Sequence, residues 1–292
     1  MGVSAGQFAP IVDPEDPITD VSREVARRWP ALEGAAWFPA IPDGYASNLG
    51  VGAITPEDAA LSAATSGAMR VIVPGTPQVL PSGLWAYRVS RHSSIVGGAL
   101  NDVGRVMAWM ERTFAAATPE EIDAALRAAP GAGTPLVLPF LTGERATGWA
   151  GNARAVFTGV SSSTTGLDLW RGACEGVAVS YARVFEQLAS VNPALSRVIA
   201  SGGVTQDYPG VMEIVTQALG FPVQVVDVKR VTMRGAAVMA LTALDPGHPM
   251  ARIPETALTL PDPAQRGYYD GLRERFEAVY DGVIAEGTAA SG

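Results

Sequence analysis

The sequence predicts an α/β protein in which a mixed β-sheet is flanked by helices. The first observation is a β-rich segment at residues 59–100, where short apolar runs are separated by glycine-containing turns. The second is the region after residue 100, where apolar runs of strand length alternate with segments of helical periodicity. Strands that alternate with helices after a β-rich segment are typical of a layered α/β architecture.

Residues 1–42 are rich in proline and predict loops around one short helix. Thr19 or Asp20 has a side chain suited to a helix N-cap, and Pro30 ends the periodic segment. Residues 36–41 form a short apolar run, which indicates a strand. The helix is expected to have one apolar face, formed by Val21, Val25 and Trp29.

Asp43 stands where the next helix is expected to begin, directly after Pro42. An aspartate at this place is often an ordinary N-cap, because its side-chain oxygen accepts hydrogen bonds from backbone N–H groups of the first turn. Taken alone, the position of Asp43 therefore favours a structural role.

The segment from Ala59 to Val73 predicts a strand, a tight turn at residues 64–68 and a returning strand. Residues 84–89 and 94–100 continue the β pattern, and Gly97-Gly98 lies near its end. Residues 101–114 then have helical periodicity. A second helix is expected to begin at Thr118, where a capping-box signal is followed by proline at the first helical position.

Two further apolar runs, at residues 136–141 and 155–160, predict strands before a long helix. Thr165 and Asp168 can cap that helix. Its apolar face predicts that Cys174 is a core residue and not a nucleophile. A final helix is expected near residues 268–284. The face of the long helix comprises Leu167, Trp170, Cys174, Val177, Tyr181, Val184 and Leu188.

The stretch from Arg197 to Leu241 combines a strand, paired glycines and a helix. The apolar run 198–200 meets Ser201-Gly202-Gly203, and a helix follows with Pro209 in its first turn and Gly220 at its C-terminal cap. Paired glycines at a strand end let backbone N–H groups approach an anionic or nucleotide ligand, and a simple tight turn is the alternative. The spacing differs from the dinucleotide fingerprint G-x-G-x-x-G.

The end of this stretch predicts one more strand and one more helix. Residues 223–226 are a β-branched run. Gly235-Ala236-Ala237 is expected to open the next apolar helix.

The composition excludes several classes of partner and chemistry. The net charge is −8 and no basic run occurs, so we expect neither a nucleic-acid nor a membrane partner. No apolar run reaches the roughly 18 residues of a membrane span. The single cysteine excludes an intramolecular disulfide and indicates a cytoplasmic protein. His92 and His248 lack ligand partners at metal-site spacing, so no metal-ligating residues are predicted.

An absent motif and one charged residue pair bear on the possible activities. The phosphate-binding motif G-x-x-x-x-G-K-[ST] is absent, which excludes a P-loop nucleotidase. Glu144-Arg145 is interpreted as an internal ion pair or a staple of its loop, with a direct catalytic role as the weaker alternative.

Six motifs in a fixed order resemble the FGGY carbohydrate kinases. The resemblance is closest to the gluconokinase-like branch, through the residues that follow Asp43, the run Thr65–Arg70 and the segment Gly148–Gly159. It spans nearly the whole chain. The motifs are Asp43-Gly44, Thr65-Ser66-Gly67, Gly97-Gly98-Ala99-Leu100-Asn101, Gly143-Glu144-Arg145, Arg171–Gly176 and Gly202-Gly203.

This resemblance implies an actin-like, ribonuclease H-like fold with two lobes and a cleft that binds ATP and a sugar. Asp43 aligns with the catalytic base, which accepts the proton of the sugar hydroxyl. Thr65, Ser66 and Gly67 align with the turn that contacts the nucleotide phosphates. The remaining expected nucleotide contacts are Gly202 and Gly203 at the adenosine, Asp207 near the purine edge, and Gly97 and Gly98 on the nucleotide side of the cleft.

The chain departs from the family pattern in three ways. Ala64 stands where the family usually has glycine before the Thr-Ser turn, which is expected to crowd the phosphate loop. Thr147 stands where relatives often have proline. The family opens with a whole first lobe that carries an Asp-x-Gly-Thr loop, whereas here only residues 1–42 precede Asp43 and that motif does not occur.

We therefore expect residues 1–46 to be a remnant of the N-terminal, sugar-binding lobe and residues 47–292 to be the FGGY C-terminal nucleotide-binding domain. The complete enzyme would use ATP and Mg²⁺ to phosphorylate a sugar or sugar acid, with a gluconate-like substrate favoured, and this chain alone is expected to be inactive. The alternative is a non-catalytic actin-fold module that associates with a separate first lobe or with a second copy of itself. A decayed gene product without function is a third, weaker hypothesis.

Overall fold

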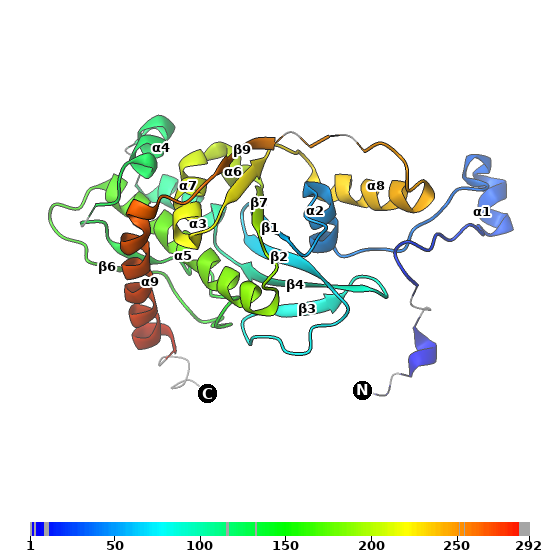
Figure 1. Cartoon of the computed structure of the whole chain (residues 1–292), viewed down its shortest axis with the longest axis horizontal. Coiled ribbons are helices and arrows are strands. Elements are labelled where there is room, and N and C mark those ends of the chain that lie inside the picture. The colour runs from blue at the N-terminus through cyan, green and yellow to red at the C-terminus, as the bar shows by residue number, and fades with distance from the viewer. Residues whose placement is uncertain are drawn as a thin grey trace.

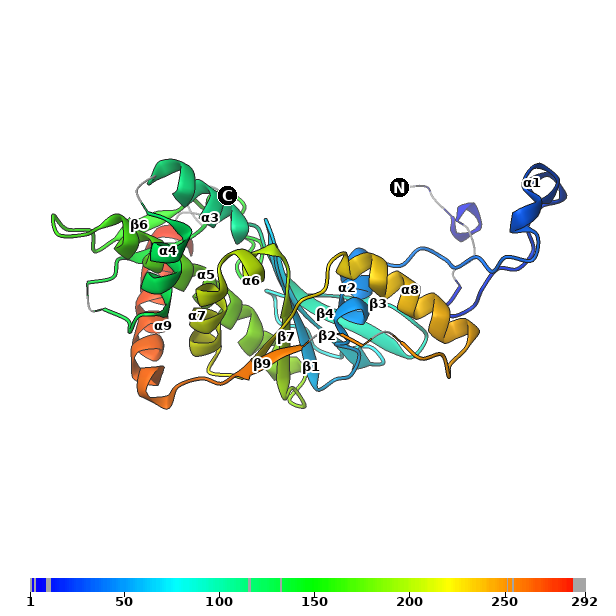
Figure 2. The same ribbon diagram turned by 90° about the horizontal axis from the view of Figure 1, so that it is seen from above.

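A computed structural model describes residues 2, 4–8, 12–114, 117–131, 133–250, 252–253 and 255–285 (Figure 1). A central mixed β-sheet is covered by helices on both faces, as the sequence predicted (Figure 2). Among the described residues, no helix has both the length and the apolar character needed to cross a membrane.

The main sheet has seven strands in the order β3-β4-β2-β1-β7-β8-β9. β1 pairs antiparallel with β2, whereas β7 runs parallel to both β1 and β8. A separate two-stranded sheet joins β5 and β6. The strands are β1 (Asp58–Ala63), β2 (Gly67–Pro74), β3 (Trp85–Arg88), β4 (Ser93–Leu100), β5 (Leu136–Leu138), β6 (Val156–Thr158), β7 (Arg197–Ser201), β8 (Val223–Val226) and β9 (Glu255–Thr259).

The helices divide between the two faces of the sheet. α5, α7 and α9 lie on one side, and α2 and α8 lie on the other (Figure 2). Short 3-10 turns cover Ala5–Gln7, Pro30–Leu32 and Pro263–Gln265, and a π-helical turn covers Asp281–Ala285. The α-helices are α1 (Arg23–Arg28), α2 (Asp43–Val51), α3 (Gly104–Thr113), α4 (Pro119–Arg127), α5 (Gly166–Val191), α6 (Gly203–Asp207), α7 (Pro209–Leu219), α8 (Val231–Leu244) and α9 (Arg266–Tyr280).

Local capping signals set several helix ends where the sequence placed them. Thr118 and Thr165 each form a complete capping box, at the starts of α4 and α5. Gly220 ends α7 in the left-handed conformation, with φ of 59°. These ends were predictable because each cap is formed by residues a few positions apart in the chain.

α5 is the central helix of the core, and it is buried along more than one face. Every residue from Trp170 to Phe185 is buried. The helix packs against β2 and β4 on one side and against α7 on the other. Cys174 lies within this buried segment with no exposed surface, which confirms that it is a core residue.

Cys174 is expected to resist alkylation as long as the chain is folded. Burial raises the pKa of its thiol, and a buried, protonated thiol is a poor nucleophile. Iodoacetamide should therefore leave the native chain unlabelled and label it fully in urea, with mass spectrometry as the measurement. Rapid labelling without denaturant would contradict the placement of Cys174 in the core.

Helices α2 and α8 approach each other so closely that glycine is required on both. A Cβ atom built at Gly235 would lie 1.7 Å from the carbonyl oxygen of Ala46, and one built at Gly50 would lie 2.0 Å from that of Val231. The expectation that Gly235 opens a helix is wrong, since α8 begins at Val231 and Gly235 lies inside it. This glycine serves the contact between two helices rather than a helix start.

Three other element predictions differ from the structure, and one strand was not predicted. α1 is capped by Ser22, whose Oγ accepts a hydrogen bond from the N–H of Val25, and not by Thr19 or Asp20. The run 36–41 forms only a single bridge, between Trp37 and Ile18. α3 starts at Gly104, because residues 101–103 form a turn at the edge of the sheet. β9 was missed because its pairing with β8 is a tertiary contact.

The N-terminal segment extends away from the sheet and carries α1 at its far end (Figure 2). It is joined to the hairpin between β3 and β4 by ion pairs of Arg91 with Asp13 and Asp16. Several of its apolar side chains are exposed, and these are Phe8, Val12, Ile18, Trp29 and Trp37.

Candidate functional site

The carboxyl ends of β1, β4 and β7 meet at one edge of the sheet. β1 and β7 are parallel with Ser62 opposite Ser201, and β4 ends opposite the start of β2, with Leu100 opposite Gly67. The segments that follow these strands therefore lie side by side. In sheets of this kind, ligands bind outside the carboxyl ends of strands, so this edge is the candidate site.

The turn between β1 and β2 presents two hydroxyl groups to solvent. Thr65 and Ser66 are exposed, as is Ala64 before them. The turn is held from the side by the start of α3, where the N–H groups of Gly104 and Arg105 donate to the carbonyl oxygens of Ala64 (2.8 Å) and Thr65 (3.1 Å). A fixed turn with exposed hydroxyl and N–H groups suits an anionic ligand.

Gly67 leaves room for the hydroxyl group of Tyr181, which packs beneath the β1–β2 turn. A Cβ atom at Gly67 would lie 2.1 Å from the hydroxyl oxygen of Tyr181, on α5. That hydroxyl donates to the carbonyl oxygen of Ser62 at 2.8 Å. Burial raises the pKa of Tyr181, so it remains a donor at ordinary pH. Gly67 thus serves the packing beneath the turn.

Gly202 lies directly beside the end of β1. Its φ is +116°, and a Cβ atom there would lie 2.2 Å from the carbonyl oxygen of Ala63. Gly203 begins α6 in open space, where the nearest atom to a built Cβ is Oδ2 of Asp207 at 3.6 Å. The structure therefore brings Gly203 and Asp207 together, next to the turn that carries Thr65 and Ser66.

The loop after β5 borders the same edge, and hydrogen bonds to Asp102 hold it in place. The buried carboxylate of Asp102 accepts hydrogen bonds from the N–H (2.8 Å) and hydroxyl (2.9 Å) of Thr142, and it pairs with Arg105 at 3.0 Å. Asn101 donates to the carbonyl oxygen of Gly143 at 2.9 Å. The role of Asp102 was not predictable from the sequence, since nothing local marks a long-range loop contact.

Glu144 staples this loop to the core through a buried ion pair. One oxygen accepts from Arg183 at 2.8 Å and from the N–H of Thr147 at 3.1 Å, while the other accepts from Tyr280. Arg183 also pairs with Glu277 at 3.1 Å. Burial opposes the charge of Arg183, but Glu277 and Glu144 outweigh it and raise the pKa of the guanidinium.

The staple interpretation of Glu144 agrees with this geometry, but its ion-pair partner is not the adjacent residue. Arg145 is exposed, whereas the partner Arg183 comes from α5, 39 residues along the chain. The long separation explains why the sequence pointed to the wrong arginine.

Asp43 lies near β2, whereas Gly202 and Gly203 follow β7. It is the first residue of α2, it is exposed, and Pro42 precedes it as the capping residue. Asp43 is close enough to Arg70 on β2 to raise the pKa of that guanidinium, against the larger effect of burial, which lowers it. Asp43 thus approaches β2, while Gly202 and Gly203 follow β7.

Gly97 and Gly98 lie inside β4, and both are buried. A Cβ atom at Gly97 would lie 2.8 Å from the ring of Trp85 and 2.9 Å from Cγ of Arg70. One at Gly98 would lie 2.8 Å from Val184 on α5. These glycines allow close packing on the two faces of the sheet, and their contact with a nucleotide stays a prediction.

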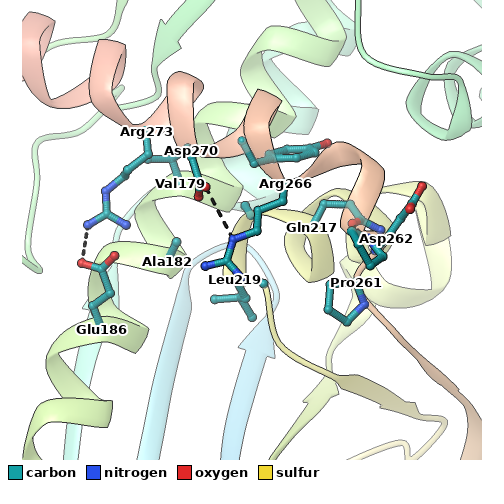
Figure 3. Close-up of a pocket in the computed structure, with 14 residues that line it drawn as sticks. Val179, Ala182, Glu186, Gln217, Leu219, Pro261, Asp262, Arg266, Asp270 and Arg273 are labelled. Carbon is teal, nitrogen blue, oxygen red and sulfur yellow. Dashed lines mark hydrogen bonds and ion pairs between the residues drawn. The ribbon is translucent and has the colours of Figure 1, made fainter.

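A hollow of about 300 Å³ lies elsewhere, between α5, α7 and α9 (Figure 3). Figure 3 shows that its charged side chains are turned toward one another, with Arg273 paired with Glu186 and Arg266 with Asp270. None of the predicted site residues lines it. In the part of the chain that the structure describes, no group of three His, Cys, Asp or Glu side chains could hold a metal ion.

Comparison with known proteins assigns most of the chain to one protein family. The model of the C-terminal domain of the FGGY family of carbohydrate kinases matches residues 59–244. The gluconokinase of Bacillus subtilis (strain 168) is 34% identical over 175 residues, which cover 55% of this chain and 34% of that protein. The gluconokinase of Bacillus licheniformis matches to the same extent. The chain thus spans about a third of the length of these curated relatives.

Solved structures share the fold over nearly the whole chain. A ligand-bound xylulose kinase from Lactobacillus acidophilus is 25% identical with a TM-score of 0.85, covering 97% of this chain and 59% of that chain. A gluconate kinase from the same organism is 24% identical with a TM-score of 0.82, covering 94% and 57%. These neighbours confirm the predicted actin-like fold, with a mixed sheet flanked by helices.

Proposed function

Because the chain belongs to the FGGY family of carbohydrate kinases, we propose that it is the nucleotide-binding part of an ATP-dependent kinase for a sugar or sugar acid. One observation carries this proposal. The Thr65-Ser66 turn and the Gly202-Gly203 pair follow adjacent parallel strands, so hydroxyl groups for phosphates and an open backbone surface for a nucleoside lie side by side. Asp207 sits next to Gly203, where it can contact the purine edge.

Asp43 is the proposed catalytic base. Its carboxylate would accept the proton of the sugar hydroxyl as that oxygen forms a bond to the γ-phosphorus and the bond to the β-phosphate oxygen breaks, releasing ADP. Asp43 is exposed in the first turn of α2, so a substrate can reach it. Phosphoryl transfer needs positioning more than a strong base, which suits a carboxylate.

The residues at this edge suit Mg²⁺ by their chemistry. The exposed hydroxyl groups of Thr65 and Ser66 offer oxygen atoms, and Mg²⁺ prefers oxygen ligands from one or two protein groups together with substrate phosphates. Mg²⁺ bound with the nucleotide would screen the charge between the phosphates.

A gluconate-like acceptor is the favoured substrate, supported by the gluconokinases that are 34% identical to this chain. We propose that residues 1–46 belong to a first lobe and residues 47–292 to the nucleotide-binding domain, and that the chain alone has little or no kinase activity. Release of ADP coupled to gluconate addition would measure this, and turnover like that of an ordinary sugar kinase would contradict it.

A second candidate function is association without catalysis, and the surface of α8 favours it. Helix α8 is apolar around most of its circumference, and Met233 is 64% and Leu244 57% exposed. A helix that is apolar all round is normally buried, so this face is suited to a separate first lobe or a second copy of the chain. A clean monomer in light scattering, without exposed apolar surface detectable by dye binding, would speak against this function.

Gly203 offers a direct test of nucleotide binding. A side chain there meets open space in the protein, so Gly203→Leu should leave the fold intact while it occupies the proposed nucleoside surface. We expect calorimetry to show ADP binding to the unaltered chain and a loss of at least about tenfold in the variant, or about 1.4 kcal/mol.

Gly166→Leu is the matched control for this substitution. Gly166 also begins a helix, α5, and a Cβ atom built there has no atom within 4 Å, so leucine meets no clash at either glycine. Its substitution should not change ADP affinity. The proposal fails if the unaltered chain does not bind ADP at millimolar concentration, or if both leucine variants bind ADP equally well.

A further inference from the structure

Arg70 is half-buried with a fully buried Nε, and it differs from the buried arginines Arg171 and Arg183 in having almost no partners. Arg171 pairs with Glu175 at 2.9 Å and also donates to backbone carbonyl oxygens, among them that of Ala128 at 2.7 Å. Arg183 pairs with two glutamates. Within the described residues, Arg70 makes one long hydrogen bond, from Nη1 to Oγ of Ser62 at 3.5 Å, and its buried Nε has none.

The surroundings leave space for this side chain. A Cβ atom at Gly44 would lie 2.8 Å from Nε of Arg70, and one at Gly97 would lie 2.9 Å from its Cγ. Glycine on the helix above and on the strand beside it thus makes room for an arginine. An unpartnered buried donor is costly, so an arginine kept in such a place points to a ligand that completes its hydrogen bonds.

The groups around Arg70 suit a polar, hydroxylated ligand. The hydroxyl of Tyr87 lies 3.2 Å from the same built Cβ of Gly44 that approaches Arg70. The ring of Trp85 stacks on that of Tyr87, with centroids 5.0 Å apart and an angle of 11° between the planes. Burial lowers the pKa of Arg70, and the nearby Tyr87 and Asp43 oppose that effect.

We propose that Arg70 binds the carboxylate of an acidic sugar beside Asp43, and that it thereby sets sugar acids as the acceptor class. This inference rests on the proposed function, since it places the acceptor next to the proposed base. A guanidinium has parallel N–H donors that match the two oxygens of a carboxylate.

The position of Arg70 in the sheet favours an acceptor over a nucleotide. Arg70 lies on β2, and the proposed nucleoside glycines follow β7, with β1 between them. Two strand spacings separate these elements by roughly 10 Å. Arg70 also lies on the side of the sheet that α2 covers, where Asp43 begins that helix.

The test compares two polyhydroxy ligands that differ at one carbon. Gluconate carries a carboxylate where glucitol carries a hydroxymethyl group. We expect an NMR titration of the whole chain to show gluconate binding that is about ten- to hundredfold tighter than glucitol binding, since the charged hydrogen bonds are lost with the carboxylate. Arg70→Met should reduce gluconate affinity by the same factor, and Arg70→Lys should restore part of it.

Two controls separate this role from a structural one. Arg88→Met removes the same charge from the edge strand β3, which β4 separates from β2; Arg88 is exposed there, and its substitution should leave gluconate affinity unchanged. ADP affinity measured on Arg70→Met reports whether the nucleotide edge is intact, and we expect it to match that of the unaltered chain.

The gluconate measurements test the role of Arg70, and the ADP measurements test the kinase proposal separately. Three results would overturn the assignment of Arg70: no gluconate binding to the unaltered chain at tens of millimolar, equal binding of gluconate and glucitol, or unchanged gluconate affinity in Arg70→Met. An equal loss of ADP and gluconate affinity in Arg70→Met would assign Arg70 to the phosphates instead. Absence of ADP binding to the unaltered chain would contradict the kinase proposal while the gluconate comparison still judges Arg70.

Discussion

Replacing Glu144 with alanine is expected to lower the free energy of unfolding by about 3–5 kcal/mol, the usual effect of removing one partner of a buried ion pair. Glu144 is only 3% exposed and accepts hydrogen bonds from Arg183, Tyr280 and the backbone of Thr147. Its loss leaves the Arg183 guanidinium buried with one carboxylate fewer. Urea unfolding followed by circular dichroism measures the change.

Glu186→Gln is the matched control for this prediction. Glu186 also pairs with an arginine of the same network, Arg273, but its side chain is 65% exposed. Exposed pairs contribute about 0–1 kcal/mol, so this substitution should change stability little. A loss of less than about 1 kcal/mol for Glu144→Ala would show that the buried pair is not what holds the loop.

Replacing Gly235 with alanine is expected to destabilise the chain by about 3 kcal/mol, near the upper end of the usual range for overpacking. The added Cβ would lie 1.7 Å from the carbonyl oxygen of Ala46, which belongs to the backbone of α2. A helix backbone cannot shift locally, so α2 and α8 must separate. The shift of the urea midpoint measures the effect.

Gly267→Ala should change stability in the opposite direction. Gly267 lies in α9 with no atom within 4 Å of a built Cβ, so alanine meets no clash there. An alanine at such a helical position stabilises by about 0.4–1 kcal/mol, mainly by restricting the unfolded chain. If both alanine variants gained stability, the close contact between α2 and α8 would be refuted.

The fold was predictable from the sequence wherever local signals define an element. Thr118 and Thr165 cap their helices through residues three positions on, and the glycine turn between β1 and β2 separates two β-branched or apolar runs. Elements that depend on a distant partner were not predictable. The strand β9 forms because it pairs with β8. Residues 36–41 form no strand, because within the described structure only Trp37 of this run makes a β-bridge, and its partner is Ile18.

The candidate site was predictable as a set of residue types and not as an arrangement. Thr65, Ser66, Gly202 and Gly203 were marked by their motifs, and the structure brings their segments together on adjacent strands. Arg70 belongs to the motif Thr65–Arg70, but no role for it was predicted, because nothing in the sequence shows that its Nε is buried without a partner.

The sequence by itself determined the family, the alternation of strands and helices, and the short motifs from which the site is proposed. Each of these is encoded by neighbours along the chain, through periodicity, capping and short motifs. The tertiary structure decided which arginine meets Glu144, why Gly235 must be glycine and that the buried Nε of Arg70 has no hydrogen-bond partner. These features depend on atoms brought together from distant positions, since close packing and burial set their energies and neither exists before the chain has folded.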